Sequence, residues 1–332
     1  MRIARSLSEL GPLSTSSVVT IGNFDGVHCG HRMVIASVLD RARELSAAAN
    51  QPVQSVAVTF DPHPAHLLHT ESRLPLITPL AEKLELLADT GLDLTLVLPF
   101  TEDLRHWSAR HFAETILRDA LHAAEVHEGE TFRFGHHAEA DINSLSGLGR
   151  DLGFSVRAYA PLTLRGAPVS SSRIRTLIAA GDVTHARALL GQPFAIDSTP
   201  ASGRGYGTRY AVPTINLAPY SDLLPAHGVY ITTLTIGAAS DTETAGETFE
   251  SVTNIGNRPT FGADSFAVES HLLNFHPIEL TEQTPLRLTF LRRLRAEQRF
   301  PTPDALRAQI LLDVAHATRY HRLRRLLTVA LP

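Results

Sequence analysis

The pattern of apolar residues changes character near residue 190 of this 332-residue chain. Before that point, apolar runs typical of strands alternate with segments whose apolar residues recur at helical spacing. Repeated strand–helix–strand units predict a parallel sheet with helices on both faces. After Pro193, strand-like runs follow one another without helices between them, which predicts an antiparallel barrel or sandwich. We therefore expect two domains, 1–187 and 188–332, a division that the chain length allows.

The same patterns place the main elements and the first candidate site. In the first half they predict strands over 17–21, 53–60, 93–99 and 155–159, with helices after His31, after Pro79 (capped by Thr78) and over 108–124. In the second half they predict a helix over 182–190, strands over 228–234 and 266–273, and a final helix over 302–327. Ligands of a parallel sheet bind beyond the carboxyl ends of its strands. The loop after the first strand is therefore the first place to expect a site.

Composition excludes several classes of protein. The formal net charge is −4, which argues against a dedicated nucleic-acid binder. The single cysteine, Cys29, cannot pair within the chain and suits a reducing cytoplasm. No stretch approaches the ~18 apolar residues of a membrane span, and the start lacks the apolar region of a signal peptide. The only lysine, Lys83, lies in a helical pattern, which excludes a P-loop NTPase. We expect a cytoplasmic protein with small-molecule substrates and with neither nucleic acid nor membrane as a partner; self-association stays open.

The strongest local motif is GNFDGVHCGH, which runs from Gly22 to His31 between the first strand and the first helix. Free N–H groups at a helix N-terminus favour phosphate, and His28 and His31 can donate to phosphate oxygens there. Gly30 lets the backbone come close to the ligand. The residues expected to bind a nucleotide in this motif are Gly22, Asn23, Asp25 and Gly30, with His28 and His31 as catalytic donors. Two alternatives are a turn with surface histidines and a His–Cys metal site, although no further ligands show tetrahedral-site spacing.

A second motif, VSSSRIR over 169–175, begins a helix with hydroxyl groups. Taken alone, it fits an N-cap and a solvated helix face. Paired with the histidine motif it predicts a second phosphate clamp at the same edge of the sheet, with Ser171, Ser172 and Arg175 as its binding residues.

The second half carries a glycine-rich loop, a Thr–Asn pair and a strand glutamate. Gly203, Gly205 and Gly207 are expected either to bind a nucleotide or to form a flexible hairpin. No helix follows them, so neither the dinucleotide-binding fingerprint nor the Walker A motif applies. In an extended strand, residues two apart share a face, so Thr214 and Asn216 could together hold Mg²⁺. Glu269 is then either a solvated strand residue or a catalytic base beside that pair.

Taken in order, these segments resemble the bifunctional bacterial riboflavin kinase/FMN adenylyltransferase family. The segments that carry the resemblance are GNFDGVHCGH, TFDPHP over 59–64, FRFG over 132–135, VSSSRIR, ARALLGQPF over 186–194, PTIN over 213–216, GVY over 228–230, NIGNRPTF over 254–261 and VESHLLNF over 268–275. The resemblance implies an α/β Rossmann-like nucleotidyltransferase domain followed by an antiparallel β-barrel riboflavin kinase domain with a C-terminal helix. It implies ATP, riboflavin and FMN as substrates and Mg²⁺ as cofactor.

The resemblance also assigns roles to residues. It implies that His28 and His31 handle phosphates, that Ser171 and Ser172 clamp ATP, that Thr214 and Asn216 bind Mg²⁺, and that Glu269 is the base of the kinase. The segment from His136 to Asp141 departs from the family pattern, because it lacks a basic residue and a glycine. Two other interpretations stay open: a different H-x-G-H transferase with an accessory barrel, and a flavin-binding or regulatory protein with only one activity.

Overall fold

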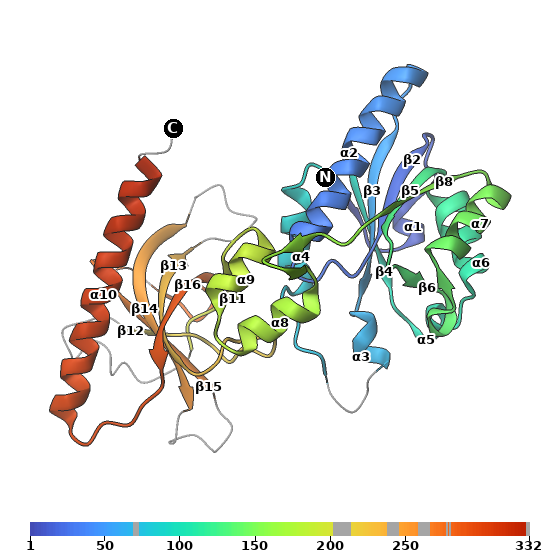
Figure 1. Ribbon diagram of the computed structural model, residues 1–332. Helices are drawn as coiled ribbons and strands as arrows, with labels where there is room; N and C mark the ends of the chain where they lie inside the picture. Colours follow the sequence, from blue (N-terminus) through green and yellow to red (C-terminus); the bar gives the residue numbers. More distant parts are fainter. Residues whose placement is uncertain are drawn as a thin grey trace. The chain divides into compact units, whose positions relative to one another are not determined.

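The computed structural model describes residues 1–68, 73–201, 214–237, 246–257, 266–276, 278 and 280–329. The chain divides into two compact units, Met1–Ser171 and Ser172–Pro332, and most of their helices and strands are labelled in Figure 1. No helix of the described ranges is long and apolar enough to cross a membrane.

The first unit contains a six-stranded parallel sheet in the order β1-β4-β3-β2-β5-β8. Its strands are β1 (Arg2–Ala4), β2 (Ser17–Ile21), β3 (Gln54–Asp61), β4 (Leu94–Pro99), β5 (Ala123–Gly129) and β8 (Ser155–Tyr159). Along the chain, β3 pairs with one edge of β2, and β4 then pairs with β3. The chain next crosses to the other edge of β2, where β5 and then β8 are added. The order of the strands therefore reverses between β2 and β5, which is where such sheets bind ligands.

Helices and short ribbons surround this sheet. The helices are α1 (Leu7–Leu10), α2 (Cys29–Ala49), α3 (Pro64–Leu68), α4 (Leu80–Ala88), α5 (Glu102–Arg105), α6 (Ala109–Phe112) and α7 (Ile142–Leu152), with a π-helical segment over Ala113–Ala120 and a 3₁₀ turn over His136–Ala138. The ribbons pair β6 (Arg133–Phe134) with β7 (Ala140–Asp141), and β9 (Thr163–Leu164) with β10 (Ala167–Pro168).

Neighbouring residues of β2 enter different cores. Val18 packs with Ile35 of α2 and Leu87 of α4. Val19 belongs to the opposite cluster, with Phe112 of α6 and Leu145 of α7. Alternate residues of a strand point to opposite faces, so helices cover both sides of the sheet. The predicted Rossmann-like α/β architecture is confirmed.

Two local predictions in this unit are wrong. The helix expected over 108–124 ends at Ala120, and β5 begins at Ala123. The chain turns at His122, whose φ is +46°, between buried apolar residues on both sides; periodicity alone does not separate a buried helix from a buried strand. Thr78 does not cap α4, because its hydroxyl accepts a hydrogen bond from the Gly26 N–H at 2.9 Å.

The second unit is an antiparallel barrel. Apart from Ser171, which belongs to the first unit, it contains α8 (Ser171–Ala179), α9 (Val183–Leu190), β11 (Phe194–Ser198), β12 (Thr214–Asn216), β13 (Gly228–Ile236), β14 (Glu247–Asn257), β15 (Phe266–Leu272), β16 (Leu286–Ala296) and α10 (Pro303–Val329). The strand order is β11-β16-β13-β14-β15-β12. A bridge between Pro200 and Leu217 brings the two ends of the curled sheet together. The predicted barrel and final helix are confirmed.

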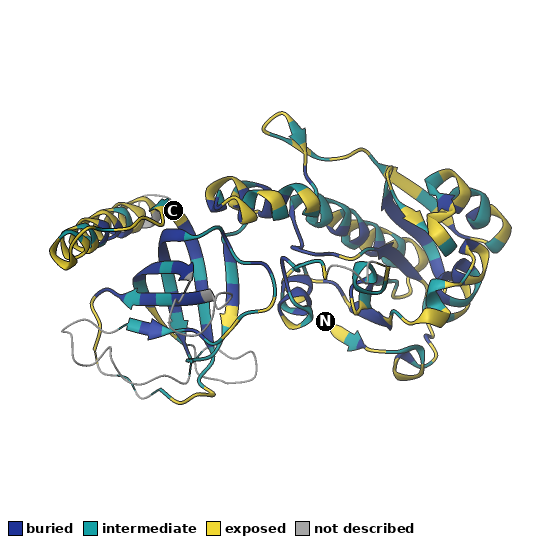
Figure 2. Cartoon of the chain, turned by 90° about the horizontal axis from the view of Figure 1, so that it is seen from below, coloured by how far each residue is buried: buried dark blue, intermediate teal, exposed yellow. Residues whose placement is uncertain are grey.

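The two faces of the barrel wall have different surroundings. Inside, the hydroxyl of Thr232 lies 2.7 Å from those of Ser251 and Thr253, and all three residues are buried. Outside, Val314 and Ala317 of α10 pack on the wall beside Val252. Figure 2 shows the buried residues concentrated on the strands, while α10 is exposed along much of its length.

The second unit begins before the boundary predicted near residue 187, because helix α9 contacts β11 and β16. Where the chain can be cut into independently folding parts stays a prediction.

Candidate active sites in the two units

The loop after β2 is fixed by buried hydrogen bonds to a neighbouring segment. The carboxylate of Asp25, which is only 1% exposed, accepts hydrogen bonds from the N–H groups of Ile77 at 2.9 Å and Thr78 at 3.0 Å. Phe24 and Val27 have positive φ angles of 47° and 37°. These contacts hold the loop in a strained form that a free chain would not keep. Asp25 therefore supports the loop from within, and its direct contact with a nucleotide stays a prediction.

His28 and His31 lie together at the N-terminus of α2. His28 is the N-cap residue, and its Nδ1 accepts a hydrogen bond from the His31 N–H at 3.3 Å. The two rings stack with centroids 3.6 Å apart and an interplanar angle of 11°. Nδ1 of His31 is buried and has no hydrogen-bond partner among the described residues. The predicted pair of phosphate donors is thus brought to one place.

Gly30 makes room for this arrangement. A Cβ atom at this position would lie 3.2 Å from Cε1 and 3.3 Å from Nδ1 of His28. That is tighter than ordinary van der Waals contact, so a side chain at Gly30 would push the imidazole away. The spacing of the motif therefore has a packing reason, beside the ligand-binding role that the sequence predicts.

Both imidazoles are neutral near pH 7. Burial lowers the pKa of His28 to about 4. Burial, together with repulsion from His28 and from Lys83, lowers the pKa of His31 well below its usual value. Each ring can still donate one N–H. Burial also lowers the pKa of Lys83, against the attraction of Asp25 and Asp61.

His28, Gly30 and His31 line a cavity of about 330 Å³ beyond the carboxyl ends of β2 and β5. Glu128 of β5 and Tyr159 of β8 line it as well. The hydroxyl of Ser171 donates to the carbonyl oxygen of Asp25 at 2.8 Å, so the second motif joins the first within this unit.

A second cavity, of about 660 Å³, shares Ile21, Gly22 and Phe132 with the first. Its other lining residues include the aromatic side chains of Phe60, Phe100, Trp107, Phe112 and Phe134. Asn23 and the segment from Gly135 to Ala138 complete its wall. Aromatic walls of this kind suit a planar ring system. The first unit therefore offers adjoining sites for a phosphate chain and for a flat aromatic group.

In the second unit, strand register gathers polar side chains on the outer face of the barrel. Glu269 of β15 lies opposite Asn216 of β12 and opposite Asn254 of β14, while Thr214 lies opposite His271. Thr214, Glu269 and His271 line a cavity of about 800 Å³ that α10 and the segment before it also line. Asn216 is adjacent in the register but is not among the described residues that line the cavity.

An ion pair ties the helix to the strands at this cavity. Arg295 of β16 and Asp313 of α10 are joined at 2.8 Å, and both line the cavity. Burial lowers the pKa of His271, so its ring is neutral. The cavity therefore combines a carboxylate, a hydroxyl and a neutral imidazole.

The remaining predicted residues have different outcomes. Ser172 is exposed and Arg175 half-buried on α8. Gly203, Gly205 and Gly207 lie outside the described residues. Across the ranges that the structure covers, no group of three or more His, Cys, Asp or Glu side chains could hold a metal ion, which gives the His–Cys alternative no support.

Sequence reasoning missed a buried acid in the first cavity. Glu128, at the end of β5, is 4% exposed and accepts hydrogen bonds from the Ile21 N–H and, at 3.4 Å, from the Thr20 hydroxyl. Burial raises its pKa well above the usual value. No motif marks Glu128; the only available signal was its place at the end of a strand, and that strand was not predicted, because the expected helix over 108–124 ran into its first two residues.

Comparisons with known proteins agree with both units. Residues 12–173 match the family model described as FAD synthetase, and residues 190–321 match that described as riboflavin kinase. The bifunctional riboflavin kinase/FMN adenylyltransferase of Pseudomonas fluorescens is 36% identical over 318 residues, which cover 96% of this chain and 97% of the relative. The protein of the same name from Escherichia coli strain K12 is 31% identical over 322 residues, covering 96% and 98%.

A solved structure described as the macrolide-efflux protein from Streptococcus pneumoniae has a TM-score of 0.80 and 24% identity, over 95% of this chain and 98% of that one. At this identity the likeness supports the fold alone. Residues 190–321 match the riboflavin kinase model, which argues against the alternative of a different H-x-G-H transferase with an accessory barrel. With both family models matched in order and relatives above 30% identity along nearly its whole length, the chain belongs to the family of bifunctional riboflavin kinases/FMN adenylyltransferases.

Proposed function

We propose that the two cavities of the first unit adenylylate FMN and that the cavity of the second unit phosphorylates riboflavin, so that one chain converts riboflavin to FMN and FMN to FAD. The observation that carries the first assignment is the stacked pair of His28 and His31, at a helix N-terminus beside an aromatic cavity. It supplies a phosphate site and a place for a flavin ring side by side.

In the adenylyl transfer, a phosphate oxygen of FMN attacks the α-phosphorus of ATP. A new P–O–P bond forms as the bond to the departing pyrophosphate breaks. The FMN phosphate is already an anion, so no strong base is needed. His28, His31 and the N–H groups at the start of α2 would stabilise the charge that builds on the pyrophosphate. Both rings are neutral beforehand, and each can donate one N–H to a phosphate oxygen.

In the kinase reaction, the terminal ribityl hydroxyl of riboflavin attacks the γ-phosphorus of ATP and ADP leaves. Glu269 would accept the proton of that hydroxyl. Thr214 and Asn216 offer a hydroxyl and an amide oxygen next to Glu269 in the strand register, a donor set of hard oxygens that suits Mg²⁺. When bound, Mg²⁺ neutralises charge on the phosphates of ATP. The chain's own task is to orient the hydroxyl and to take its proton.

The proposed conditions of action follow from composition. We propose that the protein works in the cytoplasm on small molecules, without nucleic acid or membrane. The net charge of −4 and the single Cys29 support this.

The direct test incubates the full chain with riboflavin, ATP and Mg²⁺ and separates the flavins by chromatography. FMN should form first and FAD after it, and supplied FMN should give FAD with release of pyrophosphate. A chain that forms FMN but never FAD would contradict the assignment of the first unit. A chain that forms FAD only from supplied FMN would contradict that of the second.

A further inference from the structure

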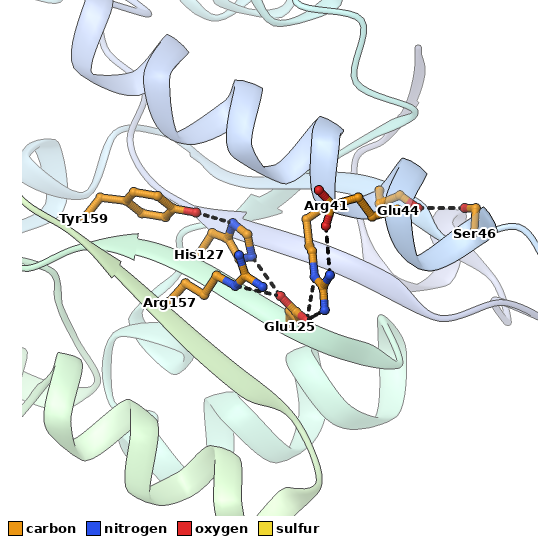
Figure 3. A network of polar contacts seen from close by, with 8 residues as sticks. Arg41, Glu44, Ser46, Glu125, His127, Arg157 and Tyr159 are labelled. Atoms are coloured by element: carbon orange, nitrogen blue, oxygen red, sulfur yellow. Dashed lines mark hydrogen bonds and ion pairs between the residues drawn. The ribbon is translucent and has the colours of Figure 1, made fainter. Parts of the chain in front are cut away.

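Strand β5 carries two buried glutamates with opposite surroundings, and the first of them is surrounded by cations. Arg41 of α2 contacts one carboxylate oxygen of Glu125 at 2.7 Å, and Arg157 of β8 contacts the other at 3.2 Å (Figure 3). Nε2 of His127 lies 3.2 Å from the same carboxylate. Burial would raise the pKa of Glu125, but the hydrogen bonds from Arg41 and His127 outweigh it and lower the pKa. Glu125 is therefore charged near pH 7.

Glu128, on the same strand, has no such cation beside it. It is 4% exposed and forms no ion pair with a described side chain. Its Oε1 accepts hydrogen bonds from two uncharged donors, the Ile21 N–H and the Thr20 hydroxyl. Burial raises the pKa of Glu128 well above its usual value, against these two hydrogen bonds. Burial of a carboxyl without a partner cation favours the protonated form.

The backbone around Glu128 explains why its side chain bonds to Ile21. The register between β2 and β5 runs only as far as Val19 on β2. The Gly22 N–H donates to the carbonyl oxygen of Val58 on β3, so the N–H of Ile21 faces the opposite side, toward β5. A buried N–H needs an acceptor, and the carboxyl of Glu128 supplies it. Glu128 thus joins β2 to β5 where their backbone pairing has ended.

This junction adjoins both cavities of the first unit. Glu128 lines the first cavity together with His28 and His31. Its hydrogen-bond partner Ile21 lines both the first and the second cavity. The substrates proposed for these cavities, ATP and FMN, are both anions. A negative charge on Glu128 would repel their phosphates, and salt and water screen a buried charge only weakly.

We propose that Glu128 is a positioning residue that acts in its protonated form: it fixes the end of β2 through Ile21 and keeps the wall of the first cavity free of negative charge. Loss of this proton should abolish FAD formation and leave FMN formation in the second unit unchanged. This inference rests on the proposed function of the first unit and adds a control of that function by pH.

Other titratable groups near the cavity are few. The wall carries His28 and His31 at the start of α2 and Tyr159 on β8, whereas β2 contributes none. Both histidines are already neutral above pH 7, because burial lowers their pKa values. Beyond them, Lys83 interacts with Asp25 and with His31, and burial lowers the pKa of Lys83. A test must therefore separate Glu128 from Tyr159 and Lys83.

The test measures kcat/KM for FAD formation from supplied FMN and ATP by the full chain, between about pH 7 and about pH 9.5, a range that includes the pKa values known for buried glutamates. Glutamine has the shape of protonated glutamate, keeps an oxygen for the Ile21 N–H and cannot ionise. In wild type, kcat/KM should fall about tenfold for each pH unit above the pKa of Glu128. In Glu128→Gln this fall should be absent.

Infrared spectroscopy observes the proton directly. The difference spectrum of wild type minus Glu128→Gln at pH 7 should contain the C=O stretching band of a protonated carboxyl. That band should disappear over the same pH range in which the rate of FAD formation falls. Because it needs no substrate, this measurement stays informative whatever the activity of the first unit is.

The matched control is Glu125→Gln, which removes the other buried carboxyl of β5 and should keep the fall of kcat/KM at high pH. Tyr159→Phe and Lys83→Met should keep it as well. FMN formation, measured in the same samples, should have one pH profile in wild type and in every variant.

Several outcomes overturn the inference. Carboxylate bands from Glu128 at pH 7 do so, as does a wild-type rate that stays level to high pH. A fall that persists in Glu128→Gln, or that disappears in Tyr159→Phe or Lys83→Met, assigns the titration to another group. A rate lowered by one factor at every pH in Glu128→Gln, with a lower melting temperature, leaves Glu128 a structural role only. If wild type forms no FAD at any pH, it is the proposed function of the first unit that fails.

Discussion

The stacked imidazoles of His28 and His31 can each give one N–H to a phosphate at the start of α2. We expect His31→Ala, and likewise His28→Ala, to lower FAD formation from FMN by about 10²–10³-fold, the usual cost of one donor to transition-state charge. FMN formation should persist, because it belongs to the second unit. His316→Ala, an exposed site on α10, is the control and should keep both rates. A His31→Ala variant with a normal rate of FAD formation would show that the motif is a turn and that His31 has no catalytic role.

The same burial makes the stability of the protein depend on pH. His28 has a pKa of about 4 when folded, against ~6.5 in an unfolded chain. Between these values the unfolded chain binds more protons, so the free energy of unfolding rises with pH and falls on acidification. From pH 7 to pH 5, His28 alone should cost about 2 kcal/mol. Denaturant unfolding of wild type and His28→Gln across this range measures it, and an unchanged slope in the variant would assign the effect to other groups.

Strand register decides the chemistry of the second unit. Glu269 reaches the cavity because β15 pairs with β12 and β14 in one alignment, and a slip by one residue would turn it to the barrel interior. We expect Glu269→Gln to lower FMN formation by about 10²–10⁴-fold with riboflavin binding little changed, because the amide keeps the shape and loses the base.

Two controls sharpen this expectation. Glu247→Gln, at the start of β14 and exposed, should leave FMN formation unchanged. FAD formation from supplied FMN should persist in Glu269→Gln. Near wild-type FMN formation in that variant would place the base elsewhere.

Elements with a clear period could be predicted from the sequence, whereas contacts between elements could not. The strand at Ser17–Ile21, the barrel strands and α10 follow from apolar pattern, and the histidine motif is contiguous, so its geometry is largely local. β5 was missed because its apolar run continues that of the preceding helix. His127 and Tyr159 are brought together by the pairing of β5 with β8, which no local pattern encodes.

The division of the chain into two units predicts that the kinase can be isolated. The sequence places the boundary near residue 187, inside α9, whose Val183 and Ala186 are buried. We expect a fragment of residues 172–332 to make FMN and no FAD. A fragment of residues 188–332 should do the same with a lower melting temperature, because it loses part of the apolar face of α9. An insoluble 172–332 fragment, beside a stable full chain, would show that the second unit depends on the first.

Lys83 is the only lysine of the protein, and it is 3% exposed. It interacts electrostatically with Asp25 and with His31. The side chain of Lys83 is therefore shielded from reagents that acylate amines while the chain is folded. Acylation at Lys83 requires α4 and the Asp25 loop to separate. The rate at which that adduct appears in a mass spectrum would time the exposure of this one buried side chain, with no label introduced by mutation.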